Sequence, residues 1–204
     1  MTRFFLRLTI GALLSLSSCM QPAKKTDEGK IRGHNYSSKE IGWTIKIPQG
    51  WEVLDLKKVR EADKKGVKAM EKVINRKIDY HTIRNLISFQ SNPYNIFRSN
   101  SKPFNMKYKE EWEDSLGKMK RIIYDTYQNL GITIDTSETT IKRIDGLDFY
   151  RYDFIIFDPK GKATLKQINY CRLINGFSFG VSISYNNEKD KNEMLKAFKE
   201  STFH

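Results

Sequence analysis

Cysteine and histidine are scarce in this chain of 204 residues, which limits the chemistry available to it. There are two cysteines, Cys19 and Cys171, so the sequence does not encode the disulfide framework of small secreted domains. The three histidines, His34, His81 and His204, have no second metal ligand at helical or hairpin spacing. We therefore expect neither a dedicated zinc site nor any other cofactor.

Long hydrophobic runs are also missing. The apolar stretch from Leu8 to Leu16 is interrupted by small and polar residues, and it is far shorter than the roughly 20 residues that a membrane-spanning helix needs. It follows Arg3 and Arg7, with no acidic residue before it. A positively charged start and a short apolar core are typical of an export signal, so residues 1–18 are predicted to be a signal peptide.

The end of this segment, Leu16-Ser17-Ser18-Cys19, resembles the lipobox of bacterial lipoproteins. Small side chains before the cleavage point suit the peptidase, and Cys19 supplies the thiol that is alkylated. The resemblance implies a diacylglycerol on the Cys19 sulfur and a further acyl chain on the new N-terminus, which together anchor a protein stably. The alternative is an ordinary signal peptide followed by a chance cysteine.

Residues 19–35 are predicted to be the lipidated cysteine and a flexible tether, because they are polar and contain Pro22, Gly29 and Gly33. Within them, Lys-Lys-Thr-Asp-Glu at 24–28 resembles the charged surface-export signals of Bacteroidetes lipoproteins. The expected location is the cell envelope, on the periplasmic or the outer face of an outer membrane. Residues 36–204 have the length and composition of a single globular domain.

The periodicity of apolar residues predicts the first elements of this domain. Asp55 and Gly131 stand where they would cap helices. Strands are predicted at 41–48, 51–54 and 83–90, helices at 56–74 and 112–130, and a Pro- and Asn-rich loop up to about residue 105.

The second half of the domain reads as a meander of strands. Strands are predicted at 138–144, 147–157, 163–174 and 177–185, and a closing helix at 188–200 with Met194, Leu195 and Phe198 facing inward. If Asn175-Gly176 is a two-residue hairpin turn, Ile174 pairs with Phe177, Tyr170 with Val181 and Ile168 with Ile183. The whole order predicts an α+β domain, in which a central antiparallel sheet carries helices on its faces as an α/β/α sandwich.

Three parts of the domain resemble the PsbP-like fold. They are Ile41-Gly42-Trp43-Thr44-Ile45-Lys46-Ile47-Pro48-Gln49-Gly50-Trp51, the strand after Asp145-Gly146, and the closing helix that runs into Ser201-Thr202-Phe203. That fold is shared by the extrinsic subunit of the oxygen-evolving photosystem, a Ran-binding import factor and many bacterial lipoproteins. The resemblance implies a binding or assembly protein, because its motifs are structural and none is catalytic.

One motif suggests an enzyme. Gly176-Phe177-Ser178-Phe179-Gly180 matches the G-x-S-x-G pattern of serine hydrolases, which depends on a sharp turn from a strand into a helix and on an oriented histidine. Here the serine follows a predicted hairpin turn inside a strand, and only His204 lies downstream. We therefore prefer an outward-facing serine on a sheet, with an envelope hydrolase using Ser178 as the runner-up function.

Two further residues allow a functional and a structural interpretation. Asp114-Ser115-Leu116 fits the O-glycosylation pattern of Bacteroidetes periplasmic proteins, although Ser115 lies near the apolar stripe of its helix. Cys171 lies in a predicted strand with no histidine nearby in sequence. We expect it to be a buried small hydrophobic residue.

Positive charge is in excess, and it is concentrated. Without residues 1–18 the chain has 34 basic against 24 acidic residues, a net charge of +10. On the helix predicted at 56–74, one sector opposite the apolar face collects Lys57, Arg60, Lys64, Lys68 and Lys72. Such a face suits anionic lipid, an acidic glycan or an acidic protein, or it is simply a solvated helix exterior. Nucleic acid is disfavoured, because no binding motif is present.

These observations favour a lipid-anchored, non-enzymatic binding or assembly module at the cell envelope. Its partners are expected to be the membrane, through the lipid on Cys19, and an envelope protein or glycan. The sequence names no cofactor and no catalytic residue.

Lipidation can be tested by removing the thiol. We expect Cys19→Ser to release the protein from the membrane fraction or to leave the signal peptide uncleaved, because the variant offers no sulfur to acylate. Fractionation of cells followed by mass measurement of the N-terminus checks this. A Cys19→Ser protein that is both processed and fully membrane-bound would contradict the prediction.

Overall fold

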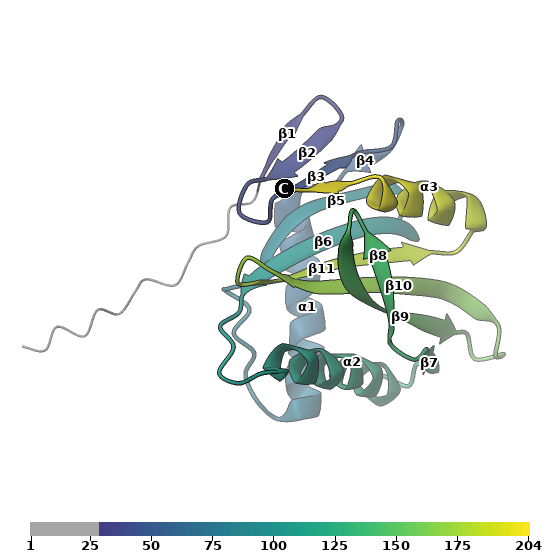
Figure 1. The fold of residues 1–204 in the computed structure, drawn as a ribbon. Helices are drawn as coiled ribbons and strands as arrows, with labels where there is room; N and C mark the ends of the chain where they lie inside the picture. Colours follow the sequence, from purple (N-terminus) through teal and green to yellow (C-terminus); the bar gives the residue numbers. More distant parts are fainter. Residues whose placement is uncertain (1–28) are drawn as a thin grey trace, which may run out of the picture.

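The computed structural model describes residues 29–204, so the predicted signal peptide, Cys19 and most of the predicted tether lie outside the described residues. In this part the chain forms three helices, α1 (Leu56–Ile74), α2 (Glu111–Asn129) and α3 (Glu188–Lys199), and two antiparallel sheets (Figure 1). The predicted α+β class is confirmed. Within residues 29–204, none of the helices combines the length and the apolar character that crossing a bilayer requires.

The strands divide into a large and a small sheet. The large sheet has the order β4-β5-β6-β11-β10-β9-β7, with β8 also paired to β9, and the small sheet has the order β1-β2-β3-β12. The large sheet consists of β4 (Glu52–Val53), β5 (Arg84–Asn92), β6 (Asn95–Pro103), β7 (Ile134–Thr136), β8 (Thr140–Ile144), β9 (Leu147–Phe157), β10 (Ala163–Ile174) and β11 (Phe177–Tyr185). The small sheet consists of β1 (Lys30–Arg32), β2 (Asn35–Ser38), β3 (Trp43–Lys46) and β12 (Thr202–Phe203).

Different elements cover the two faces of the large sheet. Phe179 of β11 belongs to the main core beneath α3 and the small sheet, whereas the preceding Ser178 faces away and accepts a hydrogen bond from Trp112 of α2. Ser182 lies on the same face as Ser178, and its neighbour Arg98 on β6 bonds to α1. Helices α1 and α2 therefore cover one face, while α3 and the small sheet cover the other (Figure 1).

Trp43 is the centre of the main core. It is 1% exposed, contacts Phe179 edge to face at 5.0 Å between ring centroids, and stacks with Phe97 at 6.4 Å and Phe203 at 6.3 Å. Its indole N–H donates to Ser201 Oγ over 3.0 Å. Because Ser201 and Phe203 follow α3, this one side chain joins the beginning of the domain to its end.

Several local predictions are confirmed. Helix α1 spans the predicted residues, and Asp55 caps it by accepting from the Lys57 N–H over 2.7 Å. Gly131 ends α2 in the left-handed conformation, at φ 72°. Asn175 and Gly176 adopt positive φ as a two-residue hairpin turn requires, and the predicted pairs are all present: Ile174 with Phe177, Tyr170 with Val181 and Ile168 with Ile183.

The Pro- and Asn-rich segment up to residue 105 is not the predicted loop. It contains β6, an interior strand of the large sheet. The sequence does not show the alternation of apolar and polar residues expected for a strand, because Asn95, Ser99 and Ser101 share the buried side of β6 with Phe97. Ser99 is satisfied there, since its hydroxyl donates to the Ile87 carbonyl and accepts from the Ile87 N–H.

The last part of the predicted tether is folded. Lys30–Arg32 form β1, which pairs with β2, and the Ile47 N–H donates to the His34 carbonyl over 2.7 Å. All side chains of β1 are exposed, so backbone pairing at a sheet edge holds the strand, and apolar periodicity gives no sign of it. The strand predicted at 41–48 also lies outside the central sheet, because β3 belongs to the small sheet.

The role of Trp43 predicts a large loss of stability on truncation. We expect Trp43→Ala to lower the free energy of unfolding by about 3–5 kcal/mol, the usual cost of emptying a buried aromatic site. Tyr94→Ala, at a residue that is 60% exposed, should change it by less than about 0.5 kcal/mol. Urea unfolding of both variants measures the difference, and similar losses in the two would contradict this account of the core.

Candidate functional site

The outward side of α1 carries the densest charge that the sequence predicted. Val59 and Val67 are buried against the rest of the protein. Arg60, which the sequence placed in the same charged sector, is half-buried and has a partner, so it lies at the flank. The exposed basic side chains, which we call the lysine face, are Lys57, Lys58, Lys64, Lys65, Lys68 and Lys72.

Asp63, an acid of α1, turns inward and does not offset the lysine face. Its carboxylate accepts from Arg98 at 2.6 Å, from the Tyr80 hydroxyl at 3.0 Å and from Asn85 Nδ2 at 2.8 Å. The side chain is 19% exposed. Burial, and then the adjacent carboxylate, raise the pKa of Tyr80 to about 12, so this phenol remains a hydrogen-bond donor at neutral pH.

Glu71 is engaged at the other end of α1. Its Oε1 accepts from the Ile78 N–H over 2.9 Å, and Oε2 lies 3.4 Å from Lys77 Nζ. The hydrogen bond from Ile78 is the main reason that the pKa of Glu71 is lowered, with Lys77 adding to it. Of the acids on α1, only Glu61 is exposed among the lysines. The lysine face therefore has more net positive charge than the composition of the helix suggests.

Ser178 does not form a nucleophile elbow. It lies inside β11, between Lys102 on β6 and Leu173 on β10, and its hydroxyl accepts from Trp112 Nε1 over 3.0 Å. The turn before it is a hairpin and not a turn from a strand into a helix. The geometry thus favours the structural interpretation of Ser178. The side chain faces away from the main core, as expected for an outward-facing serine, but α2 covers part of it.

The other residues singled out in the sequence have ordinary surroundings. Cys171 is half-buried on the α2 side of β10, where burial raises the pKa of its thiol to about 12 and Tyr152 shares a hydrogen bond with it. Ser115 is half-buried on α2, and its glycosylation stays a prediction. Among residues 29–204, no three histidine, cysteine or acidic side chains gather as a metal site.

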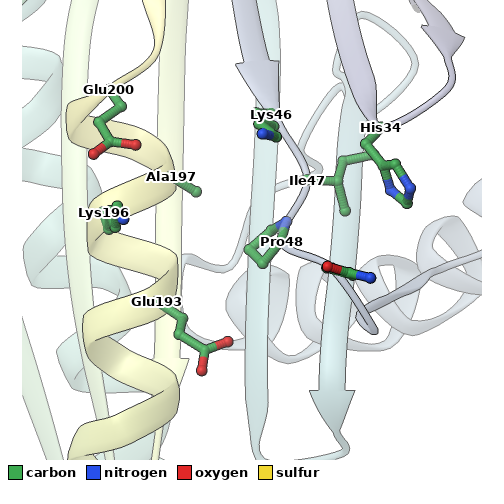
Figure 2. Close-up of a pocket in the computed structure, with 9 residues that line it drawn as sticks. His34, Lys46, Ile47, Pro48, Glu193, Lys196, Ala197 and Glu200 are labelled. Atoms are coloured by element: carbon green, nitrogen blue, oxygen red, sulfur yellow. The ribbon is translucent and has the colours of Figure 1, made fainter.

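A pocket of about 570 Å³ lies between α3 and the end of β3. Figure 2 shows residues of α3 on one wall and residues of β3 and the following turn on the other. Trp51 Nε1 donates to Glu193 over 2.8 Å, so one rim carboxylate is already engaged. The lining residues are His34, Lys46, Ile47, Pro48, Gln49, Glu193, Lys196, Ala197 and Glu200.

The pocket gives no preference for a ligand charge. Its lining combines Lys46 and Lys196 with Glu193 and Glu200, and it includes the apolar Ile47 and Ala197. Sequence reasoning missed it because its walls come from separate segments, whose approach depends on the packing of α3 beside the small sheet. The lysine face is the more distinct candidate, since six lysines stand there against one exposed acid, Glu61.

Comparison with solved structures identifies the fold. The chain is similar to cyanobacterial PsbP (CyanoP) from Synechocystis, with a TM-score of 0.56 and 10% identity over 93% of this chain and 99% of that chain. A protein from Bacteroides thetaiotaomicron aligns with a TM-score of 0.46 and 11% identity over 85% of this chain and 49% of that one. No protein-family model and no curated protein matches the sequence. The expected PsbP-like fold is confirmed, and at this identity the likeness shows the fold alone.

The bond from Trp112 predicts what Ser178 does. We expect Ser178→Ala to lower the free energy of unfolding by about 1–3 kcal/mol, because the buried indole N–H loses its acceptor. Ser184→Ala, on the same face of β11, is the matched control and should cost less. Urea unfolding measures both. A broad esterase and amidase screen accompanies it, and turnover that Ser178→Ala abolishes would contradict a structural role.

Proposed function

We propose that this protein is a lipid-anchored, non-enzymatic binding module of the cell envelope, and that the lysine face of α1 is its binding surface. The observation that carries the proposal is the separation of charge on α1. Six lysines point outward, while Asp63 is held by Arg98 and Glu71 by Lys77 and the Ile78 backbone. A surface with a large excess of positive charge attracts anionic partners over several ångströms without any shaped pocket.

The predicted lipid on Cys19 supplies the location in this proposal. The lipobox resemblance supports anchoring, and the charged tether supports an outer membrane, on its periplasmic or surface face. A PsbP-like domain at that site fits the binding and assembly class that the sequence resemblance implies. The anionic partner belongs to the envelope, as a lipid, a glycan or a protein.

A dense polyanion tests the binding surface directly. The mature chain with Cys19→Ser is applied to immobilised heparin, and we expect changing Lys57, Lys64 and Lys68 to Glu to lower the salt concentration needed for elution well below that of the parent. Changing Lys142, Lys160 and Lys162 to Glu alters the net charge equally, at the opposite edge of the large sheet from α1. Equal shifts in the two variants would show that net charge, and not α1, governs binding.

A further inference from the structure

We infer that the lysine face binds the anionic phospholipid headgroups of the membrane that holds the protein's own anchor, and thereby fixes the orientation of the domain. The inference rests on the proposed function and names its partner. It begins with the shape of the surface. Helix α1 has 19 residues and is therefore about 28 Å long, and the lysines occupy it from Lys57 to Lys72. A long stripe of charge is matched by an extended anionic surface.

The kind of cation also favours a lipid surface. The lysine face has no arginine in its exposed part, since Arg60 lies half-buried at the flank. Arginine forks suit the fixed geometry of a specific carboxylate or phosphate site, whereas lysine ammonium groups are mobile point charges on flexible stems. Mobile charges can follow headgroups that diffuse in a fluid layer. This composition favours attraction without a fixed stereochemistry.

The inward acids make the attraction strong enough to matter. Each lysine near an anionic surface strengthens binding roughly fivefold. Asp63 and Glu71 would cancel part of this if they faced outward, but both are engaged within the protein, and only Glu61 remains among the six lysines. The sequence alone counted three acids on this helix and could not tell which of them face the solvent.

The short tether converts this attraction into an orientation. If Cys19 carries the lipid, residues 20–28 separate it from the first described residue, Gly29, and the distance between Cys19 and Gly29 is at most about 35 Å. The domain is then confined near the surface, so the second contact is intramolecular and acts at a high effective concentration. Even a weak lysine contact suffices to bias the domain toward one orientation.

The binding experiment uses the mature chain with Cys19→Ser, so that no acyl chain contributes. Vesicles of phosphatidylcholine alone and of phosphatidylcholine mixed with phosphatidylglycerol are sedimented with the protein at about 0.1 M and about 1 M salt, where the Debye length is roughly 10 Å and 3 Å. We expect binding to the mixed vesicles at low salt only. The Lys57, Lys64 and Lys68 to Glu variant should bind at least about a hundredfold more weakly, because three attractive charges are lost and three repulsive ones are added. The Lys142, Lys160 and Lys162 to Glu variant should retain most of the affinity.

The outcomes separate this inference from the function on which it rests. Equal indifference to both vesicle types overturns the lipid inference, and heparin binding that still needs the lysine face then leaves an acidic glycan or protein as the partner. If both triple variants bind heparin as tightly as the parent does, the proposed function is overturned as well. If the two triple variants lose equal amounts of affinity for the mixed vesicles, the assignment of the lipid-binding surface to α1 is overturned. Circular dichroism and urea unfolding are used to check that both variants are folded.

Orientation is tested on the lipidated protein, because its acyl anchor holds it on both kinds of vesicle whether or not the lysine face binds. The lysine side chains of the anchored protein are labelled chemically by acylation, on neutral and on mixed vesicles, and the extent of labelling at each lysine is measured by mass spectrometry. We expect Lys64 and Lys68 to react several-fold more slowly in mixed vesicles, while Lys160 and Lys162 react equally in both. Unchanged reactivity of Lys64 and Lys68 would overturn the orienting role.

Discussion

Strand β6 presents the aromatic ring of Phe97 to one face of the large sheet and the guanidinium of Arg98 to the other, and these two neighbours contact different layers. On one side Phe97 stacks on Phe89 at 4.5 Å between ring centroids and meets Trp43 and Phe198. On the other side Arg98 reaches α1. The side of Phe97 therefore accepts a layer that is held by aromatic packing, while the polar side, which carries Arg98, accepts helices that are fixed partly by hydrogen bonds.

Helix α1 depends on the polar side of this arrangement. Its buried apolar side chains are Val59 and Val67, so the hydrogen bonds of Asp63 with Arg98, Tyr80 and Asn85 are a substantial part of its attachment. Removing one member of such a half-buried ion pair leaves the other charge uncompensated, which is costly. The Asp63 carboxylate is thus used to hold α1 in place, and it is not exposed among the lysines. The charge separation that makes α1 a candidate site is a consequence of the way in which the helix is held.

The sequence predicted the elements whose signal is local and failed where the signal depends on partners. The apolar spacing of α1 and its Asp55 cap gave its bounds, and the Asn175-Gly176 turn gave the register of β10 with β11. Strand β6 was missed because Ser99 and Ser101 face the core, whereas the sequence signal for a half-buried strand is an apolar residue at every second position. Strand β1 was missed because only backbone pairing holds it.

The candidate site was predicted in the same partial way. Helical periodicity placed Lys57, Lys64, Lys68 and Lys72 on one exposed face, and the structure brings these four together there. Periodicity could not show that Arg60 is half-covered or that Asp63 turns inward, since both depend on contacts across the fold. The Asp63 partners lie 17 to 35 residues away in sequence. No spacing rule connects them.

The lysine face opposes the stability of the helix that carries it. Lys64, Lys68 and Lys72 follow one another at four-residue steps, where like charges repel by about 0.2–0.5 kcal/mol per pair. A helix that only needed to be soluble would gain by placing glutamates among these positions, because opposite charges at that spacing attract. The caps at Asp55 and Asn75 and the attachment through Asp63 offset the repulsion in the free protein. An anionic surface would remove the repulsion and add attraction, so α1 is more stable in contact with such a surface than it is in solvent. This difference supports the proposed role of the lysine face as a binding surface for an anionic partner.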